Sequence, residues 1–222
     1  MVWANIEQVF EGRHMNSRTH MLVGAALSVA LLRPLNATAL LIDIAGGFLG
    51  GWICDVDVNT KTEAKDYFFG VDIILPLCVI AFIDRFCSLG IIDHILLQLG
   101  PKSALGISCF VALLVLGSQW KVLCRHRTFM HSLLAVGLFS CALELAFAPL
   151  VPSFFIGMVA HILLDMTNKK GVQVLYPLPF KPCLGLFKSD GAVDTVISLC
   201  ALVVLVYLAQ GFLPVPVVPN TA

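Results

Sequence analysis

Seven long apolar runs, separated by prolines, glycines and charged residues, divide the chain and leave little sequence for a hydrated surface. They fall at about 18–33, 38–54, 71–83, 104–120, 131–149, 152–165 and 192–212. Hydrophobic residues make up 59% of the 222 residues and charged residues 13%, with a mean hydropathy of +0.92. This composition is far too apolar for a soluble domain, and it predicts an all-α, polytopic membrane bundle of about seven helices.

Several of these runs are short for a membrane span. The 13 residues of 71–83 cover roughly 20 Å as a helix, whereas the hydrocarbon core is about 30 Å thick. We therefore expect some helices to be extended by their flanks or to be partly re-entrant. The run 192–212 is the most ordinary span, and the proline-rich end after it cannot continue a helix.

Small and polar residues inside the runs predict how the helices pack. The second run contains two overlapping pairs of glycines spaced four apart, a pattern that lets helix backbones approach closely: Gly46, Gly47, Gly50 and Gly51. Asp43 and Glu144 are costly in lipid, so we expect both to face the bundle interior. Four cysteines in apolar runs are predicted to be buried thiols, not a disulfide frame: Cys78, Cys109, Cys141 and Cys200.

Imidazole, guanidinium and hydroxyl groups crowd together in the segment 126–132, HRTFMHS, between two apolar runs. Histidines five residues apart lie roughly 140° apart around a helix, so His126 and His131 cannot share one helix face. We expect His131 at a helix start and His126 on the preceding loop, from where both rings can point at one metal ion. A hydrogen-bonded polar cap at the mouth of a membrane helix is the alternative for any single histidine.

Further polar residues return to the same membrane face. His20 opens the first run, and a turn at Arg33-Pro34 sends the second run back with two aspartates at its end. The fifth and sixth runs form a second such hairpin, and it carries His161 and Asp165 one helical turn apart on one face. By parity of crossings, one face holds seven candidate ligands for one to three metal ions: His20, Asp55, Asp57, His126, His131, His161 and Asp165.

These residue types favour one class of metal. Imidazole and carboxylate ligands suit zinc, manganese or iron, with zinc expected first. Cys54 and Cys124 are close in sequence, but thiol ligation is the weaker alternative. A metal held in this way lowers the pKa of a bound water to about 7 and supplies hydroxide for attack on an ester or phosphoester. Arg127 is placed to clamp an anionic substrate oxygen, with a headgroup-facing arginine as the alternative.

In these motifs the chain resembles the bacterial inner-membrane-associated metal-dependent hydrolases, a family that includes LexA-regulated members. The resemblance covers roughly residues 15–180. It is carried by Thr19-His20 before a Gly24-containing helix, by Asp55-Val56-Asp57, by the segment 126–132, and by His161-x-x-x-Asp165 followed by Thr167, Gly171 and Pro177. Where the family reads HRGxTHS, Thr128 replaces the glycine and Met130 the threonine. More loosely, the set is similar to the His/Asp zinc clusters of helical phospholipase C and P1-type nucleases, an analogy that favours phosphoester substrates.

Together, the residues and the resemblance predict a membrane-bound metal-dependent hydrolase of an ester or phosphoester in a lipid-borne or membrane-proximal substrate. Asp57 or Asp165 is expected as general base, with Arg127 stabilising the developing negative charge. Membrane lipids are expected partners, whereas a formal net charge of zero gives no reason to expect nucleic acid. Two alternatives stay open: a metal-ion or proton-coupled transporter, and a stress-linked membrane protein with a structural metal.

The sequence predicts three segments. Residues 1–14 form an N-terminal extension before Met15, which is an alternative start; 15–213 form the membrane-embedded metal-dependent hydrolase-like domain; and 214–222 form a flexible C-terminal tail.

The distribution of basic residues predicts the orientation in the inner membrane. Seven-helix parity places eleven of the 14 lysines and arginines on the metal side, and only Arg33, Arg85 and Lys102 on the other. The positive-inside rule then puts the metal site and the N-terminus in the cytoplasm, and the C-terminus outside.

Overall fold

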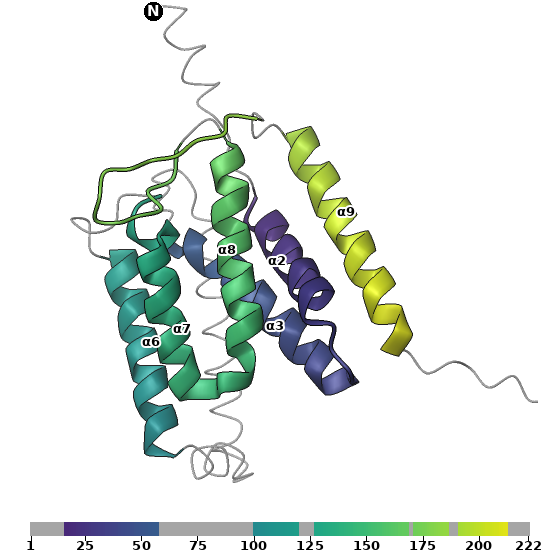
Figure 1. Ribbon diagram of the computed structural model, residues 1–222, viewed down its shortest axis with the longest axis horizontal. Coiled ribbons are helices and arrows are strands. Elements are labelled where there is room, and N and C mark those ends of the chain that lie inside the picture. Colours follow the sequence, from purple (N-terminus) through teal and green to yellow (C-terminus); the bar gives the residue numbers. More distant parts are fainter. Residues whose placement is uncertain (1–15, 58–99, 120–126, 169–170, 187–190, 213–222) are drawn as a thin grey trace, which may run out of the picture.

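A computed structural model describes residues 16–57, 100–119, 127–168, 171–186 and 191–212 of the chain (Figure 1). Within these ranges the protein is helical, without strands, so the all-α prediction is confirmed there. The α-helices are α2 (Ser17–Leu32), α3 (Ala37–Ile53), α6 (Pro101–Gln119), α7 (Leu133–Phe147), α8 (Val151–Thr167) and α9 (Gly191–Ala209). Short 3-10 turns join or end them: η1 (Cys54–Asp57), η2 (Phe129–His131), η3 (Ala148–Leu150) and η4 (Gln210–Phe212).

Six of the seven predicted runs coincide with these helices. The predicted run 71–83, the extension 1–14 and the tail 214–222 lie outside the described residues. Two described stretches are long and apolar enough to cross a membrane: 133–167, which contains α7 and α8, and 192–212. The apolar helices α2 and α3 and the stretch 101–117 are shorter.

Local capping explains the hairpin formed by α2 and α3. α2 ends at Arg33, whose backbone is left-handed with a φ of 50° and whose N–H donates to Val29 O. Asn36 then caps α3, because its side-chain oxygen accepts from Ala39 N at 2.8 Å. The predicted reversal at Arg33-Pro34 is therefore confirmed, and it is fixed by local hydrogen bonds.

Glycines set the packing of three central helices. Gly46 and Gly50 of α3 meet α8, at Ser153 and at Phe154, while Gly47 and Gly51 meet α2, at Gly24 and at His20. A Cβ at any of these glycines would collide with the facing helix. The two predicted glycine pairs thus serve two different partner helices.

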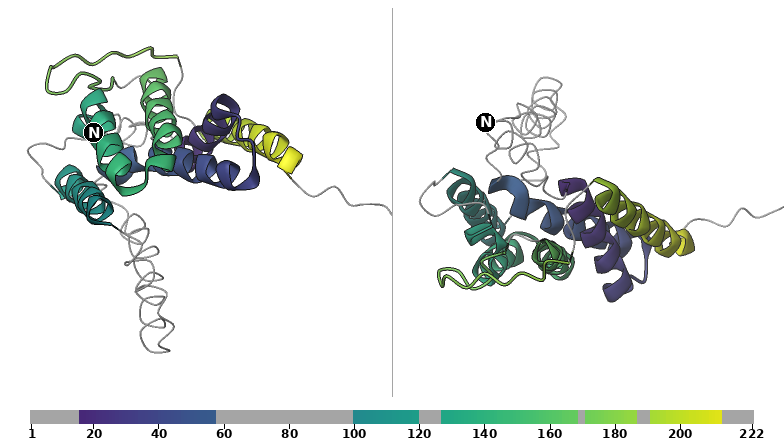
Figure 2. Two further views of the ribbon diagram at one scale, coloured as in Figure 1. Left: turned by 60° about the horizontal axis from the view of Figure 1, so that its bottom comes forward. Right: turned by 90° about the horizontal axis from the view of Figure 1, so that it is seen from above.

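The other three described helices flank this trio, with α7 in contact with α8. α6 packs on α7, and α9 packs along α2 on the outside of the bundle, an arrangement that Figure 2 shows in two further views. The ring of Phe110 on α6 meets the rings of Phe139 on α7 and Phe154 on α8 edge to face, with centroids 5.1 and 5.9 Å apart. This aromatic core lies between the helices, away from the polar end of the bundle.

Two expectations about interior residues are wrong. Asp43 is buried as predicted, but Glu144 is exposed on α7 because the inward stripe of that helix runs through Phe139 and Leu143. Cys109, Cys141 and Cys200 are exposed instead of buried, and Cys78 lies outside the described residues. In a membrane protein the outer helix faces are apolar as well, so an apolar run does not indicate that its cysteine lies inside the bundle.

The glycine contacts predict a sharp difference between two alanine substitutions. Gly157→Ala would push a methyl group into the Gly47 carbonyl oxygen, and we expect a loss of about 1–3 kcal/mol in stability from overpacking. Gly137→Ala is the matched control, because nothing lies within 4 Å of its added Cβ. Unfolding in detergent measures both, and equal effects would contradict the packing described.

Candidate metal centre

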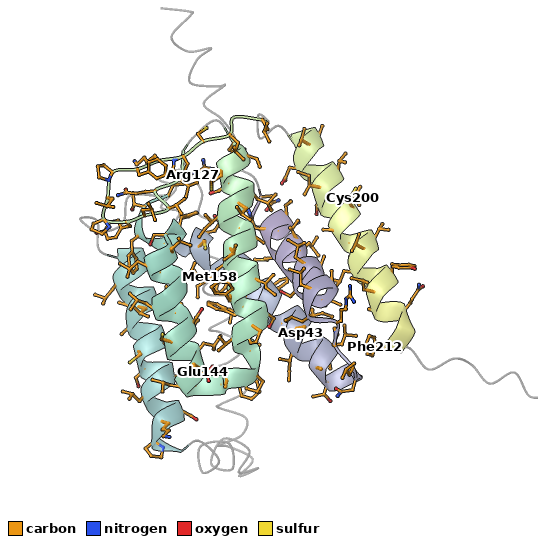
Figure 3. The ribbon with its side chains drawn as sticks, in the orientation of Figure 1. Asp43, Arg127, Glu144, Met158, Cys200 and Phe212 are labelled. Carbon is orange, nitrogen blue, oxygen red and sulfur yellow. The ribbon has the colours of Figure 1, made fainter. Side chains whose placement is uncertain are left out.

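The polar residues of the predicted site converge on one end of the bundle. His20 lies in the first turn of α2, Asp55 in η1 after α3, His131 in η2 before α7, and His161 and Asp165 near the end of α8. Figure 3 shows Arg127 at this end, with Glu144 at the opposite end of α7. The three histidines are at most 1% exposed, and Asp165 is 3% exposed. Antiparallel helices therefore bring four chain segments to one buried cluster.

His161 lies at the centre of the cluster with a defined tautomer. Its Nδ1 is 2.7 Å from the backbone oxygen of Gly51. A carbonyl oxygen only accepts, so Nδ1 carries the hydrogen, which leaves Nε2 with a lone pair directed into the cluster. A second ring nitrogen bonded to a backbone carbonyl is typical of metal-ligating histidines.

The other donor atoms surround His161 Nε2 at short range. His131 Nε2 is 3.2 Å away, Asp55 Oδ1 3.5 Å and Asp165 Oδ2 3.8 Å. His131 Nε2 also lies 3.3 Å from Asp165 Oδ2. The donor atoms form two groups, and within each group all of them lie within 4.8 Å of one another. The first group is His131, His161 and Asp165, and the second is His20, Asp55 and His161.

His20 completes the second group. Its ring stacks on that of His161, with centroids 3.9 Å apart, and its Nε2 is 3.7 Å from Asp165 Oδ1. Among the described residues, His20 Nδ1 and Asp55 Oδ2 are buried without a hydrogen-bond partner. Buried polar atoms of this kind are costly unless an ion or water satisfies them.

The charge state of Asp55 suits cation binding. Burial by itself raises the pKa of this carboxyl. The positive charge that His161 and His20 carry when protonated and a hydrogen bond from the Ser17 side chain lower it, and together they hold the pKa below its ordinary value. The group is therefore a carboxylate at neutral pH, which is the form that binds metal ions.

Arg127 orients Asp165. Its Nη2 donates to Asp165 Oδ1 at 3.0 Å, and Asn168 Nδ2 donates to the same oxygen at 3.4 Å. With Oδ1 held in this way, Oδ2 is the oxygen that faces His131. Sequence reasoning missed Asn168, although its spacing of three residues after Asp165 on a helix end is a usable signal.

Local backbone structure holds Arg127 and His131 in place. Arg127 has a left-handed backbone with a φ of 66°, and its carbonyl oxygen accepts from Gln173 N at 3.0 Å. After His131, Ser132 caps α7 by accepting from Ala135 N, so His131 lies at the helix start as predicted. The backbone oxygen of Thr128 closes the turn by accepting from His131 N at 3.2 Å.

Five of the seven predicted ligands are brought together, and Arg127 joins them. The other two are not placed: the backbone of Asp57 lies in η1 but its side chain is outside the described part of the chain, and His126 lies outside it altogether. Cys54 is fully buried in the apolar core and belongs to neither donor group, while Cys124 lies outside the described residues.

The fold and site define a helical membrane protein with a buried histidine and aspartate cluster at one end. A family model described as YdjM inner membrane protein matches residues 15–216, so the chain belongs to this family. This confirms the prediction of an inner-membrane family and, with the two apolar stretches, of membrane localisation. No curated protein and no solved structure matches the chain.

The pairing of Arg127 with Asp165 predicts that substitutions at these two residues have strongly non-additive effects on the stability of metal-free protein. Arg127→Gln leaves a buried carboxylate without its cation, so we expect a loss of about 3–5 kcal/mol in stability. Adding Asp165→Asn should recover part of that loss, whereas Arg33→Gln, on an exposed residue, should change stability by less than about 0.5 kcal/mol. Unfolding in detergent with a chelator measures these proteins together with the Asp165→Asn single variant, and additive effects of the two site substitutions would contradict the pairing.

Proposed function

We propose that the chain is a multi-pass, metal-dependent hydrolase of ester or phosphoester bonds. The single observation that carries the proposal is the cluster of five ligand-type side chains with His161 at its centre. Apolar bundles seldom bury so many ionisable groups unless the groups serve a site. Membership of an inner-membrane family and the resemblance in sequence motifs support the same proposal.

The donor spacing fits a small divalent ion. Ligands about 2.0–2.1 Å from a tetrahedral zinc lie about 3.3 Å from one another. The contacts among His131, His161 and Asp165, at 3.2, 3.3 and 3.8 Å, are close to that spacing. We therefore propose these three as ligands of a first ion, with zinc preferred and manganese or iron as alternatives.

The second donor group offers a place for the water molecule that attacks the ester or for another ion. His161 belongs to both groups, yet it has one nitrogen available and serves one ion at a time. His20 and Asp55 then either complete the shell of the first ion or hold a second one.

The chain's own residues supply the remaining chemistry. When bound, a divalent cation makes a water molecule acidic enough to attack an ester at neutral pH. Asp55 Oδ2 has no hydrogen-bond partner among the described residues, so it is better placed to accept the proton than Asp165, whose oxygens face Arg127 and His131. Asp57 stays a second candidate for the proton acceptor. Arg127 acts mainly by orienting Asp165.

The transport alternative draws less support. A transporter needs polar groups along a path through the bilayer, and Glu144 faces outward. Among the described residues Asp43 is the one buried carboxyl away from the metal centre. Measuring turnover distinguishes a catalytic metal from a merely structural one.

Metal content and hydrolysis test the proposal together. We expect purified protein to bind zinc, and His131→Ala combined with His161→Ala to abolish binding, because both remove central donor atoms. Asp165→Asn should lower metal affinity by about 10–100-fold or more, whereas Glu144→Gln, a matched change on the outer face of α7, should leave it unchanged. Elemental analysis and screening of phosphodiesters and phospholipids provide the measurements. Metal flux in vesicles without metal-dependent turnover would favour a transporter.

The proposed orientation places the metal centre in the cytoplasm and the C-terminus outside, with seven spans. A reporter fused after Lys188 should therefore show a cytoplasmic signal, and one fused at Ala222 a periplasmic signal. The reverse result at either position would exclude this topology.

A further inference from the structure

The loop 171–186 covers the end of the bundle that contains the metal centre (Figure 1). Gln173 N donates to Arg127 O at 3.0 Å, and Leu133 N donates to Val174 O at 2.9 Å. Val172 is fully buried in the core cluster. The inner side of the loop is thus bonded directly to the segment that supplies Arg127 and His131.

The outer side of the same loop is apolar. Four large side chains along it are each 58–62% exposed: Leu178, Phe180, Leu184 and Leu186. Its only charged residue is Lys181, which is also exposed. Loops that face water are seldom so apolar, and an exposed patch of this kind marks an interaction surface.

The backbone of the loop is suited to a partly dry environment. Six of its N–H groups donate to backbone oxygens, and three positions are prolines without an N–H: Pro177, Pro179 and Pro182. Irregular backbone is tolerated at membrane depth only when its polar groups are satisfied. More than half of the sixteen positions therefore need no water as hydrogen-bond acceptor.

Three observations favour membrane lipid as the partner of the exposed apolar side of the loop. The loop is hydrogen-bonded at Val174 to the start of α7, where Leu133 and Leu134 are also exposed and apolar, in a protein of an inner-membrane family. α7 and α8, with 15 and 17 residues, span only about 22–25 Å and fall short of a hydrocarbon core of about 30 Å. In sequence, the loop is bracketed by Lys169, Lys170 and Lys188, which complement anionic headgroups.

We propose that the loop 171–186 seats its exposed apolar side chains in the interfacial zone of the leaflet beside the metal centre. Resting on the proposed function, this narrows the substrate class to an amphiphile that stays in the membrane and presents its ester or phosphoester at headgroup level. A soluble phosphoester would gain nothing from such a loop. The loop is therefore a positioning element for the substrate, and its residues are not ligands.

Fluorescence of full-length Phe180→Trp protein in vesicles tests the lipid contact without any assay of catalysis. The vesicles contain phosphatidylcholine and phosphatidylglycerol, and the signal is the difference from the parent protein with its three tryptophans. We expect stronger quenching by lipids brominated near the headgroup than by aqueous iodide. Stronger quenching by iodide would overturn the proposal, and so would shielding from both quenchers, because a second copy or another protein segment would then cover the loop.

A pair of double variants tests the substrate class. Leu178→Ser with Phe180→Ser should keep metal content and soluble phosphoester turnover within about twofold, yet lower turnover of vesicle phospholipid about tenfold. Leu31→Ser with Leu35→Ser removes two exposed apolar side chains at the turn between α2 and α3 and should leave both activities unchanged. Equal loss on both substrates would contradict the positioning role. Bromolipid quenching without hydrolysis of any ester would support the lipid contact and reject the hydrolase.

Discussion

The close backbone approach of α3 to α2 and α8 is the constraint on which the rest of the structure depends. Glycines on two stripes of α3 make it feasible, because any side chain there would collide with a neighbouring helix. The same approach forms the site: Gly51 lies against the backbone of His20 and accepts the hydrogen bond from His161 Nδ1. The contact at Gly51 therefore serves both the packing of the helices and the orientation of the His161 ring. A bundle spaced by larger residues would separate His20 from His161 and leave the His161 ring without its orienting carbonyl.

The polar cluster is costly to the fold in the absence of a ligand. Three histidines and a carboxylate are almost completely removed from solvent, and His20 Nδ1 and Asp55 Oδ2 lack a hydrogen-bond partner in the described part of the chain. Arg127 offsets part of this cost by pairing with Asp165, and a divalent cation would offset more of it. The cluster makes physical sense as a binding site, and the apolar loop above it would give that site access to the membrane surface.

Sequence patterns predicted the helices well because each depends on local information. Apolar runs, the cap at Asn36, the turn at Arg33-Pro34 and the glycine pairs are all readable within a few residues. The same patterns failed for Glu144 and for three cysteines, which are exposed on outer helix faces. Lipid and protein interior are equally apolar, so hydropathy cannot separate an inward from an outward face of a membrane helix. A polar residue in such a run needs the three-dimensional packing to assign its direction.

For the site, the sequence by itself determined the types of ligand, their pairing on helix ends and, by parity of crossings, their presence on one side of the bundle. Only the tertiary structure decided how they meet: His161 lies between two donor groups, Arg127 is bonded to Asp165, and Asn168 and Gly51 orient the ligands. The reason is physical. Spacing along a helix fixes which residues share a face, but distances between side chains on different helices are set by the separation and rotation of those helices. That separation and rotation are set by contacts at glycines between segments more than a hundred residues apart in sequence, such as the contact of Gly51 with His161.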